Sequence, residues 1–229
     1  MLMAAIGTAH AADATEPSGS TQVAYAVPGP SNAAGESTYP TPFIRTIRRS
    51  VETGLFPKWH GAITRTMLQL DGGGARPPVR GTERIAETRG VFDRIVATAA
   101  AKSGLDQLAT VNNLVDAVPY RSDQELYGVS DYWATPLEML AAGGGDCEDH
   151  AIAKLAALNR AGVPEDELRL VVGIDIATGK AHAMAVAELD GTAYALDGRT
   201  GRVVRWNSAE LQFKPLYVAG FHRVWIYRS

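Results

Sequence analysis

Residues 143–155 read GGGDCEDHAIAKL, and they contain Cys147, the single cysteine of this 229-residue chain. Three glycines, which favour turns, precede Asp146, and the residues that follow are typical of a helix. The sequence therefore predicts a helix from Asp146 to about residue 161, where a Gly-Val-Pro stretch ends it. Cys147 then lies in the first turn, where free N–H groups and the helix dipole favour a thiolate.

The same stretch crowds the thiol with the carboxylates of Asp146, Glu148 and Asp149. Negative charge nearby raises the pKa of a thiol and suppresses the reactive thiolate. Cys147 is therefore either an inert, small buried side chain, as unpaired cysteines often are, or a nucleophile whose acidic surroundings are offset by another charge.

A histidine and an aspartate downstream favour the nucleophile. His182 begins an expected strand over residues 182–189, and Asp197 ends the next one over 192–197. Asp190-Gly191 between them is typical of a tight hairpin, so we expect His182 and Asp197 to be cross-strand neighbours, each about seven residues from the turn. A base oriented by a carboxylate, facing a thiol at a helix start, is the geometry of a Cys-His-Asp site. Singly, each residue has a plainer explanation as a strand-end or turn residue.

Hydrophobic periodicity indicates the fold class. Apolar residues at helical spacing predict helices over residues 59–70, 82–102, 105–118 and 135–142. After the predicted helix that begins at Asp146 the period changes, and strands are expected over residues 168–176, 182–189, 192–197, 201–206 and 221–228. Helices followed by an antiparallel meander indicate an α+β fold.

Composition divides the chain into three parts. Residues 1–11 are expected to be a signal peptide remnant, since Ala9-His10-Ala11 has the form of a signal-peptidase site, and export would follow. Residues 12–41 are rich in Pro, Gly, Ser, Thr and Ala, which predicts a disordered linker. Residues 42–229 are expected to form one domain, with a helical lobe over about 42–118 and a catalytic core over about 119–229.

The overall composition excludes several classes of protein. The chain is 46% hydrophobic and 21% charged, so a sizeable core can form and global disorder is excluded. A net charge of −3 argues against a general nucleic-acid or anionic-membrane binder. One cysteine excludes an internal disulfide. No apolar run approaches the roughly 18 residues that a membrane-spanning helix needs.

Four stretches resemble the bacterial transglutaminase-like cysteine proteinases, in particular the LapG-type periplasmic proteases. They are SDQELYGVSDYWATPLEML, GGGDCEDHAIAKLAALNRAGVPEDELRLV, the hairpin GKAHAMAVAEL with TAYALDGRTGRVVRW, and FHRVWIYR, which together extend from about residue 118 to the end. The resemblance implies a papain-like, transglutaminase-like fold in which Cys147 is the nucleophile, His182 the base and Asp197 the orienting acid. The chain departs from the family pattern at His150, where an aromatic residue is expected, and after Asp197, where Gly-Arg stands in place of Asn.

The resemblance also implies a cofactor and partners. LapG-type proteases require calcium, and they cut a large surface adhesin near its N-terminus in the periplasm, within an Ala-Ala-containing sequence, which releases the cell from a biofilm. An inner-membrane cyclic-di-GMP receptor sequesters the protease. We therefore expect Ca²⁺ as cofactor, a surface adhesin as substrate and such a receptor as inhibitory partner, with no nucleic acid.

The acidic residues then allow two interpretations. Asp146 and Asp149 are spaced like a capping box at the helix start. Alternatively Asp146, Glu148 and Asp149 are calcium ligands, because Ca²⁺ takes about six to eight oxygens and its charge would offset theirs. Asp123 and Asp131 are the candidate ligands from the preceding loop.

An acyl-enzyme also needs donors for its oxyanion. The backbone N–H of Cys147 is one, and Gln124 or Trp133 is a candidate for the second, although Trp133 equally fits a buried anchor for its loop. His150 is a further candidate, as a local proton partner of the thiol.

Three functions fit these residues. The first is a cysteine endopeptidase. The second is a transglutaminase-type acyl transferase, which shares the acyl-enzyme, and the third is a non-catalytic binding module of the same fold.

Overall fold

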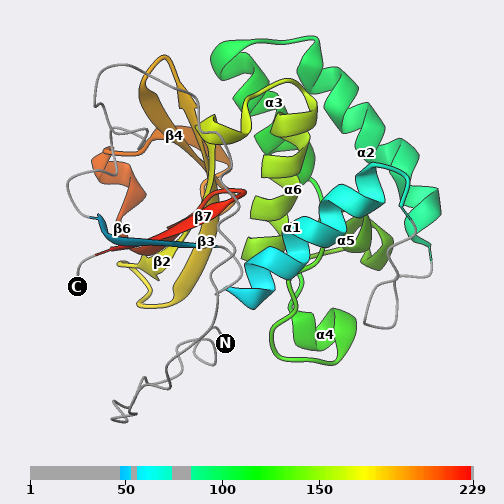
Figure 1. The fold of residues 1–229 in the computed structure, drawn as a ribbon, viewed down its shortest axis with the longest axis horizontal. Coiled ribbons are helices and arrows are strands. Elements are labelled where there is room, and N and C mark those ends of the chain that lie inside the picture. Colours follow the sequence, from blue (N-terminus) through cyan, green and yellow to red (C-terminus); the bar gives the residue numbers. More distant parts are fainter. Residues whose placement is uncertain (1–46, 53–55, 74–83, 228–229) are drawn as a thin grey trace, which may run out of the picture.

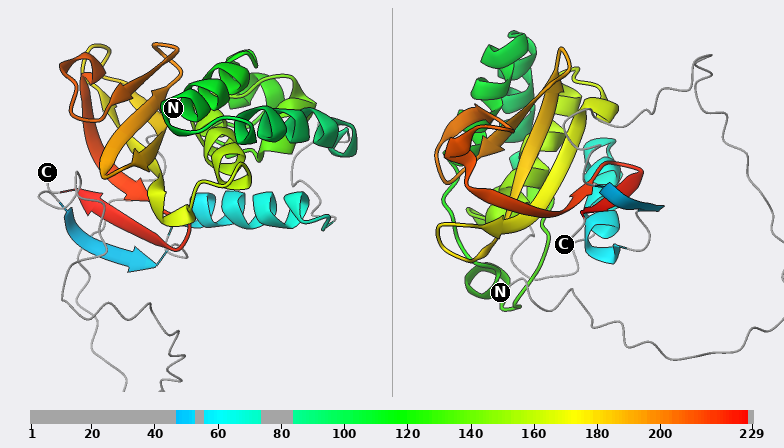
Figure 2. Two further views of the ribbon diagram at one scale, coloured as in Figure 1. Left: turned by 90° about the horizontal axis from the view of Figure 1, so that it is seen from above. Right: turned by 90° about the vertical axis from the view of Figure 1, so that its left-hand side faces the viewer.

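A computed structural model describes residues 47–52, 56–73 and 84–227. The expected signal peptide remnant, residues 1–11, and the expected linker, residues 12–41, lie outside the described residues. A seven-stranded antiparallel sheet carries the helices on one side (Figures 1 and 2). None of the helices in the described ranges is long and apolar enough to cross a membrane.

The predicted helices are present with small shifts at their ends. They are α1 (Pro57–Leu70), α2 (Ile85–Ala100), α3 (Gly104–Asp116), α5 (Pro136–Ala142) and α6 (Cys147–Arg160). A further helix, α4 (Asp123–Tyr127), was not predicted, because five residues are too few to show helical periodicity. The described ranges also contain two short 3-10 helices, η4 (Glu165–Glu167) and η5 (Ala209–Leu211).

The sheet is more complex than the expected meander. Its strands are β1 (Ile47–Glu52), β2 (Leu168–Asp175), β3 (Ala181–Leu189), β4 (Thr192–Asp197), β5 (Arg202–Arg205), β6 (Phe213–Ala219) and β7 (Arg223–Tyr227). Their order is β1-β7-β6-β2-β3-β4-β5, so only β2 to β5 form a meander. After β5 the chain returns to the other side of β2.

Two strands correct the sequence-based prediction. Residues 47–52 were expected at the start of the helical lobe, but they form β1, which pairs with β7 at the opposite end of the chain. β6 was not predicted, because Lys214 and Pro215 interrupt its apolar alternation, and proline within a run demotes a strand prediction. Long-range pairing decides both strands.

Helix α6 is the central element of the fold (Figure 1). It packs on β2 and β3 on one side and on α2, α3 and α5 on the others. Every residue from Glu148 to Leu158 is buried, and four of the eleven are alanines, namely Ala151, Ala153, Ala156 and Ala157. A helix that is covered all round and rich in small side chains allows close approach of its neighbours, so its N-terminus is held rigidly against the sheet.

The first helix ties the helical layer to the far end of the sheet. Trp59 of α1 is buried, and its indole Nε1 donates to the carbonyl of Gly220 at 2.8 Å. Its ring meets Trp133 and Phe221 edge-on, with centroids 6.4 and 6.5 Å apart. Buried aromatic residues with a satisfied polar atom anchor segments that are distant in sequence. The loop that precedes α5 is therefore held between α1 and the β6–β7 turn.

Candidate active site

The nucleophile helix starts as the sequence predicts. Asp146 is the N-cap of α6, and it forms a capping box with Asp149. Gly145 packs so tightly that a Cβ there would lie 2.8 Å from carbons of Asp149 and Met139. Cys147 is the first helical residue, and its backbone N–H has no acceptor among the described residues. That N–H remains available for a substrate oxygen.

The thiol of Cys147 lies between the acidic helix start and strand β3. Its Sγ donates to Glu148 Oε2 at 3.1 Å. Burial raises the pKa of the thiol well above its ordinary value, and the charges of Glu148 and Asp146 raise it further. The backbone of Ala183, the residue after His182, acts in the opposite direction. Cys147 therefore lies against the strand that carries the histidine, but its carboxylate neighbours favour the neutral thiol.

His182 and Asp197 form the expected pair, although not in the expected register. The Asp190-Gly191 turn has positive φ at both residues, as a tight hairpin requires, and it joins Leu189 to Thr192. This register makes His182 and Asp197 diagonal neighbours rather than direct partners, since Ala185 pairs with Leu196 and the next position, Asp197, is then two residues out of step with His182. The diagonal arrangement still brings the two side chains within hydrogen-bond distance, because Nε2 of His182 lies 3.0 Å from Oδ1 of Asp197.

The Asp197 carboxyl is completely buried. Burial alone would raise its pKa, but hydrogen bonds from His182 and Arg199 outweigh that effect and hold the pKa below its ordinary value. Asp197 therefore remains ionised and is an acceptor for Nε2–H in the tautomer of His182 that leaves Nδ1 unprotonated.

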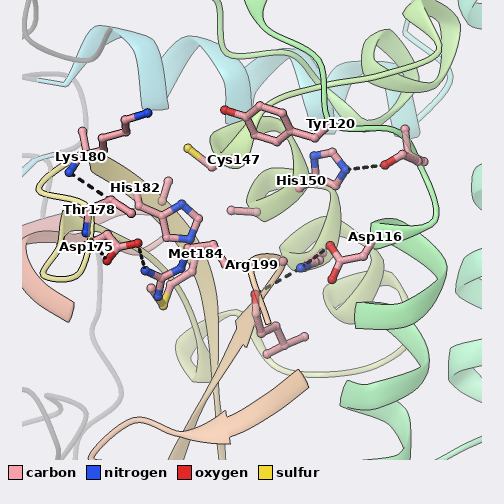
Figure 3. Close-up of a pocket in the computed structure, with 17 residues that line it drawn as sticks. Asp116, Tyr120, Cys147, His150, Asp175, Thr178, Lys180, His182, Met184 and Arg199 are labelled. Atoms are coloured by element: carbon pink, nitrogen blue, oxygen red, sulfur yellow. Dashed lines mark hydrogen bonds and ion pairs between the residues drawn. The ribbon is translucent and has the colours of Figure 1, made fainter. Parts of the chain in front are cut away.

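Cys147 and His182 line one cavity of about 440 Å³ between α6 and the sheet. Figure 3 shows both side chains pointing into it, with Tyr120 above the thiol and Lys180 on the opposite rim. The cavity thus contains a thiol at a helix start and an imidazole that is oriented by a carboxylate. This arrangement can perform nucleophilic acyl transfer.

A cluster of buried carboxylates lies beside the thiol. Oxygens of its members approach one another within 4.8 Å in overlapping groups. We call it the acidic cluster, and it consists of Asp123, Asp131, Asp146, Glu148 and Asp149. The two loop residues that the sequence suggested as extra ligands, Asp123 and Asp131, thus lie where that hypothesis needs them. The capping box and the cluster coexist, because Asp149 contributes to both.

Comparison with known proteins agrees with this geometry. A profile of the family described as "Bacterial transglutaminase-like cysteine proteinase BTLCP" matches residues 83–226, which is more than half of the chain. The chain belongs to this family of cysteine proteinases. No curated protein sequence matches the chain.

Solved structures of Legionella pneumophila LapG have a similar fold. The calcium-bound form is 24% identical, with a TM-score of 0.54, over 72% of this chain and 87% of that one. The EGTA-treated form is 23% identical, with a TM-score of 0.56, over 73% of this chain and 87% of that one. The expected transglutaminase-like cysteine proteinase fold is therefore confirmed.

The other candidates from the sequence are not directed at the thiol of this cysteine proteinase. The ring nitrogens of His150 lie 2.8 Å from the carbonyl of Asp146 and 3.0 Å from that of Val118, so the imidazole packs the helix start. Trp133 is buried, and its Nε1 donates to Asp131, which fits the loop anchor rather than the oxyanion donor. Gln124 is exposed on α4 and does not line the cavity.

Sequence reasoning missed several charged residues that line the cavity. Lys154 of α6 is fully buried; its Nζ lies 2.7 Å from Asp116 and donates to the carbonyl of Leu196 at 3.2 Å. Its position seven residues after Cys147, on the same helix face, was an available signal. Arg199 forms one ion pair with Asp197 and another with Asp175. Nothing in the local sequence indicates that Asp175, at the end of β2, meets Arg199.

Proposed function

We propose that this protein is a calcium-dependent cysteine endopeptidase of the periplasm that cleaves a large cell-surface adhesin. One observation carries the catalytic part: the hydrogen-bonded pair His182–Asp197 and the thiol of Cys147 line the same cavity. Family membership supports peptide hydrolysis.

The residues fit the roles of a triad. His182 donates Nε2–H to Asp197, so its Nδ1 takes the thiol proton as Cys147 attacks the peptide carbonyl. Asp197 stays ionised and stabilises the imidazolium. The backbone N–H of Cys147 donates a hydrogen bond to the developing oxyanion. The imidazolium then protonates the leaving amine. Water, activated by the same Nδ1, releases the acyl group from sulfur.

The acidic cluster fits a calcium ion. Its oxygens are the ligand type that Ca²⁺ prefers, and Oδ1 of both Asp123 and Asp146 is buried without a hydrogen-bond partner among the described residues. Burial also raises the pKa of Asp146 to about 9 and that of Glu148 to about 7, which indicates carboxylates that lack a counter-charge. The related LapG of Legionella has been solved with calcium bound. Bound to these carboxylates, calcium would neutralise the charge that disfavours the thiolate.

The adhesin, the periplasmic location and the inhibitory inner-membrane cyclic-di-GMP receptor are supported by the family resemblance. The Ala9-His10-Ala11 pattern supports export. Together they support a role in the control of biofilm attachment.

The test is to compare the surface and secreted proteins of cells that express the wild type, Cys147→Ala or His182→Ala. We expect a large surface protein to be released, with one new N-terminus, only by the wild type in the presence of calcium. His222→Ala is the matched control, since that exposed histidine contacts only Glu165 at 3.1 Å among the described residues. Release by Cys147→Ala would refute the proposal, and incorporation of an added primary amine would indicate acyl transfer instead.

A further inference from the structure

The side chain and the backbone N–H of Arg199 both donate to the Asp197 carboxylate. Its Nε and Nη2 donate to Oδ2 of Asp197 at 2.9 and 2.6 Å, Nε also lies 3.1 Å from Oδ1, and its backbone N–H donates to Oδ1 at 3.0 Å. His182 donates to Oδ1 as well, at 3.0 Å. Both oxygens of Asp197 thus accept hydrogen bonds. A bidentate arginine contact fixes the plane of a carboxylate and stabilises its ionised form.

The guanidinium is itself held from a third direction. Its Nη1 lies 2.5 Å from Oδ2 of Asp175, at the end of β2. The other oxygen of Asp175 accepts the backbone N–H of Ala177 at 2.8 Å, so this carboxylate is fixed by its own turn. Nη2 of Arg199 also donates to the carbonyl of Leu211 at 3.2 Å. Arg199 therefore links three segments of the chain, at Asp175, Asp197 and Leu211.

The main chain on both sides of Asp197 is restrained by other residues, whereas Arg199 restrains the rotation of its carboxylate. The backbone before Asp197 is held by Lys154, whose Nζ donates to the carbonyl of Leu196. The backbone after it is close-packed, because a Cβ on Gly198 would lie 3.1 Å from Asp116 Oδ1. The main chain is thus fixed by other groups, whereas His182 and Arg199 are the hydrogen-bond partners of the carboxylate among the described residues.

We propose that Arg199 is a positioning residue, which holds the Asp197 carboxylate in the orientation that receives His182, with Asp175 as its support. The inference rests on the proposed function, because it assigns Arg199 a part in that same triad. A buried carboxylate paired only with a neutral imidazole could rotate or lose its charge, whereas a guanidinium is permanently charged and planar. The Gly-Arg that follows Asp197 is also where this chain departs from the family pattern.

The test compares Arg199→Gln, Arg199→Lys, Asp175→Asn and the double variant Arg199→Gln/Asp175→Asn. The matched control is Arg202→Gln, because Arg202 pairs with Asp197 along the strands but directs its side chain to exposed Glu210 at 2.6 Å. Two measurements are made on the full chain: kcat and KM on a peptide spanning the mapped cleavage site, and the downfield NMR signal of the hydrogen-bonded His182 Nε2–H.

We expect Arg199→Gln to lower kcat by about 10- to 100-fold with KM little changed, and to broaden or abolish the imidazole signal. Arg199→Lys should recover only part of this, since an ammonium cannot span both oxygens. The double variant should be no worse than Arg199→Gln, because Asp175 acts through Arg199. Arg202→Gln should match the wild type.

The outcomes separate this proposal from the proposed function. Unchanged kcat with an intact imidazole signal in Arg199→Gln overturns the positioning role while peptide cleavage stands. A rise in KM alone also overturns it, since Arg199 would then contact substrate. If the wild type cleaves nothing but the signal still depends on Arg199, the positioning role stands and the proposed function fails. Should Arg199→Gln not fold, Arg199→Lys and Asp175→Asn provide the same readouts, and wild-type values in both would refute the role.

Discussion

The contact between Cys147 and Glu148 makes a quantitative prediction about thiol reactivity. The two side chains lie 3.1 Å apart. At an effective dielectric constant of about 20, two unit negative charges at 3.1 Å repel by about 5 kcal/mol, or nearly four powers of ten in the thiolate fraction. Glu148→Gln removes one of these charges. Burial and the charge of Asp146 still oppose ionisation of the thiol, so only part of this gain is expected.

The assay is alkylation by iodoacetamide at pH 8.5, which reports on Cys147 alone because the chain has one cysteine. In EGTA, Glu148→Gln should react at least about tenfold faster than the wild type. In calcium the order should reverse, since the wild type gains a counter-charge whereas the variant has lost a proposed ligand. The control is Glu125→Gln, which removes an exposed carboxylate paired with Arg121.

Two results would refute this reasoning. If Glu148→Gln reacts no faster than the wild type in EGTA, with unchanged melting, the Glu148 charge does not restrain the thiol. If calcium accelerates the variant as much as the wild type, Glu148 is not a ligand.

Three further predictions concern stability. Burial raises the pKa values of Asp123, Asp146, Glu148 and Asp149, that of Glu148 to about 7, so the folded state binds more protons than the unfolded one and their contribution is lost as pH rises from about 4. In EGTA the melting temperature should therefore decrease as the pH is raised from 5 to 9, and calcium should reduce this decrease. A melting temperature that increases over the same pH range would contradict the raised carboxyl pKa values. Gly145→Ala should lower the free energy of unfolding in urea by about 1–3 kcal/mol, because the added Cβ collides with two side chains. The control Gly90→Ala, on the exposed face of α2, should be neutral or stabilising, and equal effects of the two changes would refute the close packing at Gly145. Lys154→Met should lower the free energy of unfolding by about 3–5 kcal/mol, because it leaves Asp116 without its partner. The double variant Lys154→Met/Asp116→Leu should recover most of that stability, and additive losses would show that the two residues are not coupled.

Local chemistry was readable from the sequence. The helix start at Asp146 and the hairpin turn at Asp190-Gly191 depend on residues adjacent in the chain, and both are confirmed. His182 and Asp197 were paired correctly because a two-residue turn limits the registers of a hairpin, even though the offset between them was misjudged. The helices with clear periodicity were predicted to within a few residues for the same reason.

Contacts between distant segments were beyond such reasoning. β1 and β6 have weak sequence patterns, and each is held in the sheet by pairing with a neighbouring strand. The link from Arg199 to Asp175 joins two turns that sequence spacing does not relate.

The sequence by itself determined the thiol, its helix start, the histidine–aspartate hairpin and the acidic residues around Cys147, since propensity, capping and turn geometry act over a few residues. Only the tertiary structure decided that Asp123 and Asp131 complete the acidic cluster and that Arg199 pairs with both Asp197 and Asp175. The physical reason is that charge acts through space. Which carboxylates share a buried site, and which cation meets them there, depends on how the sheet and the helices pack.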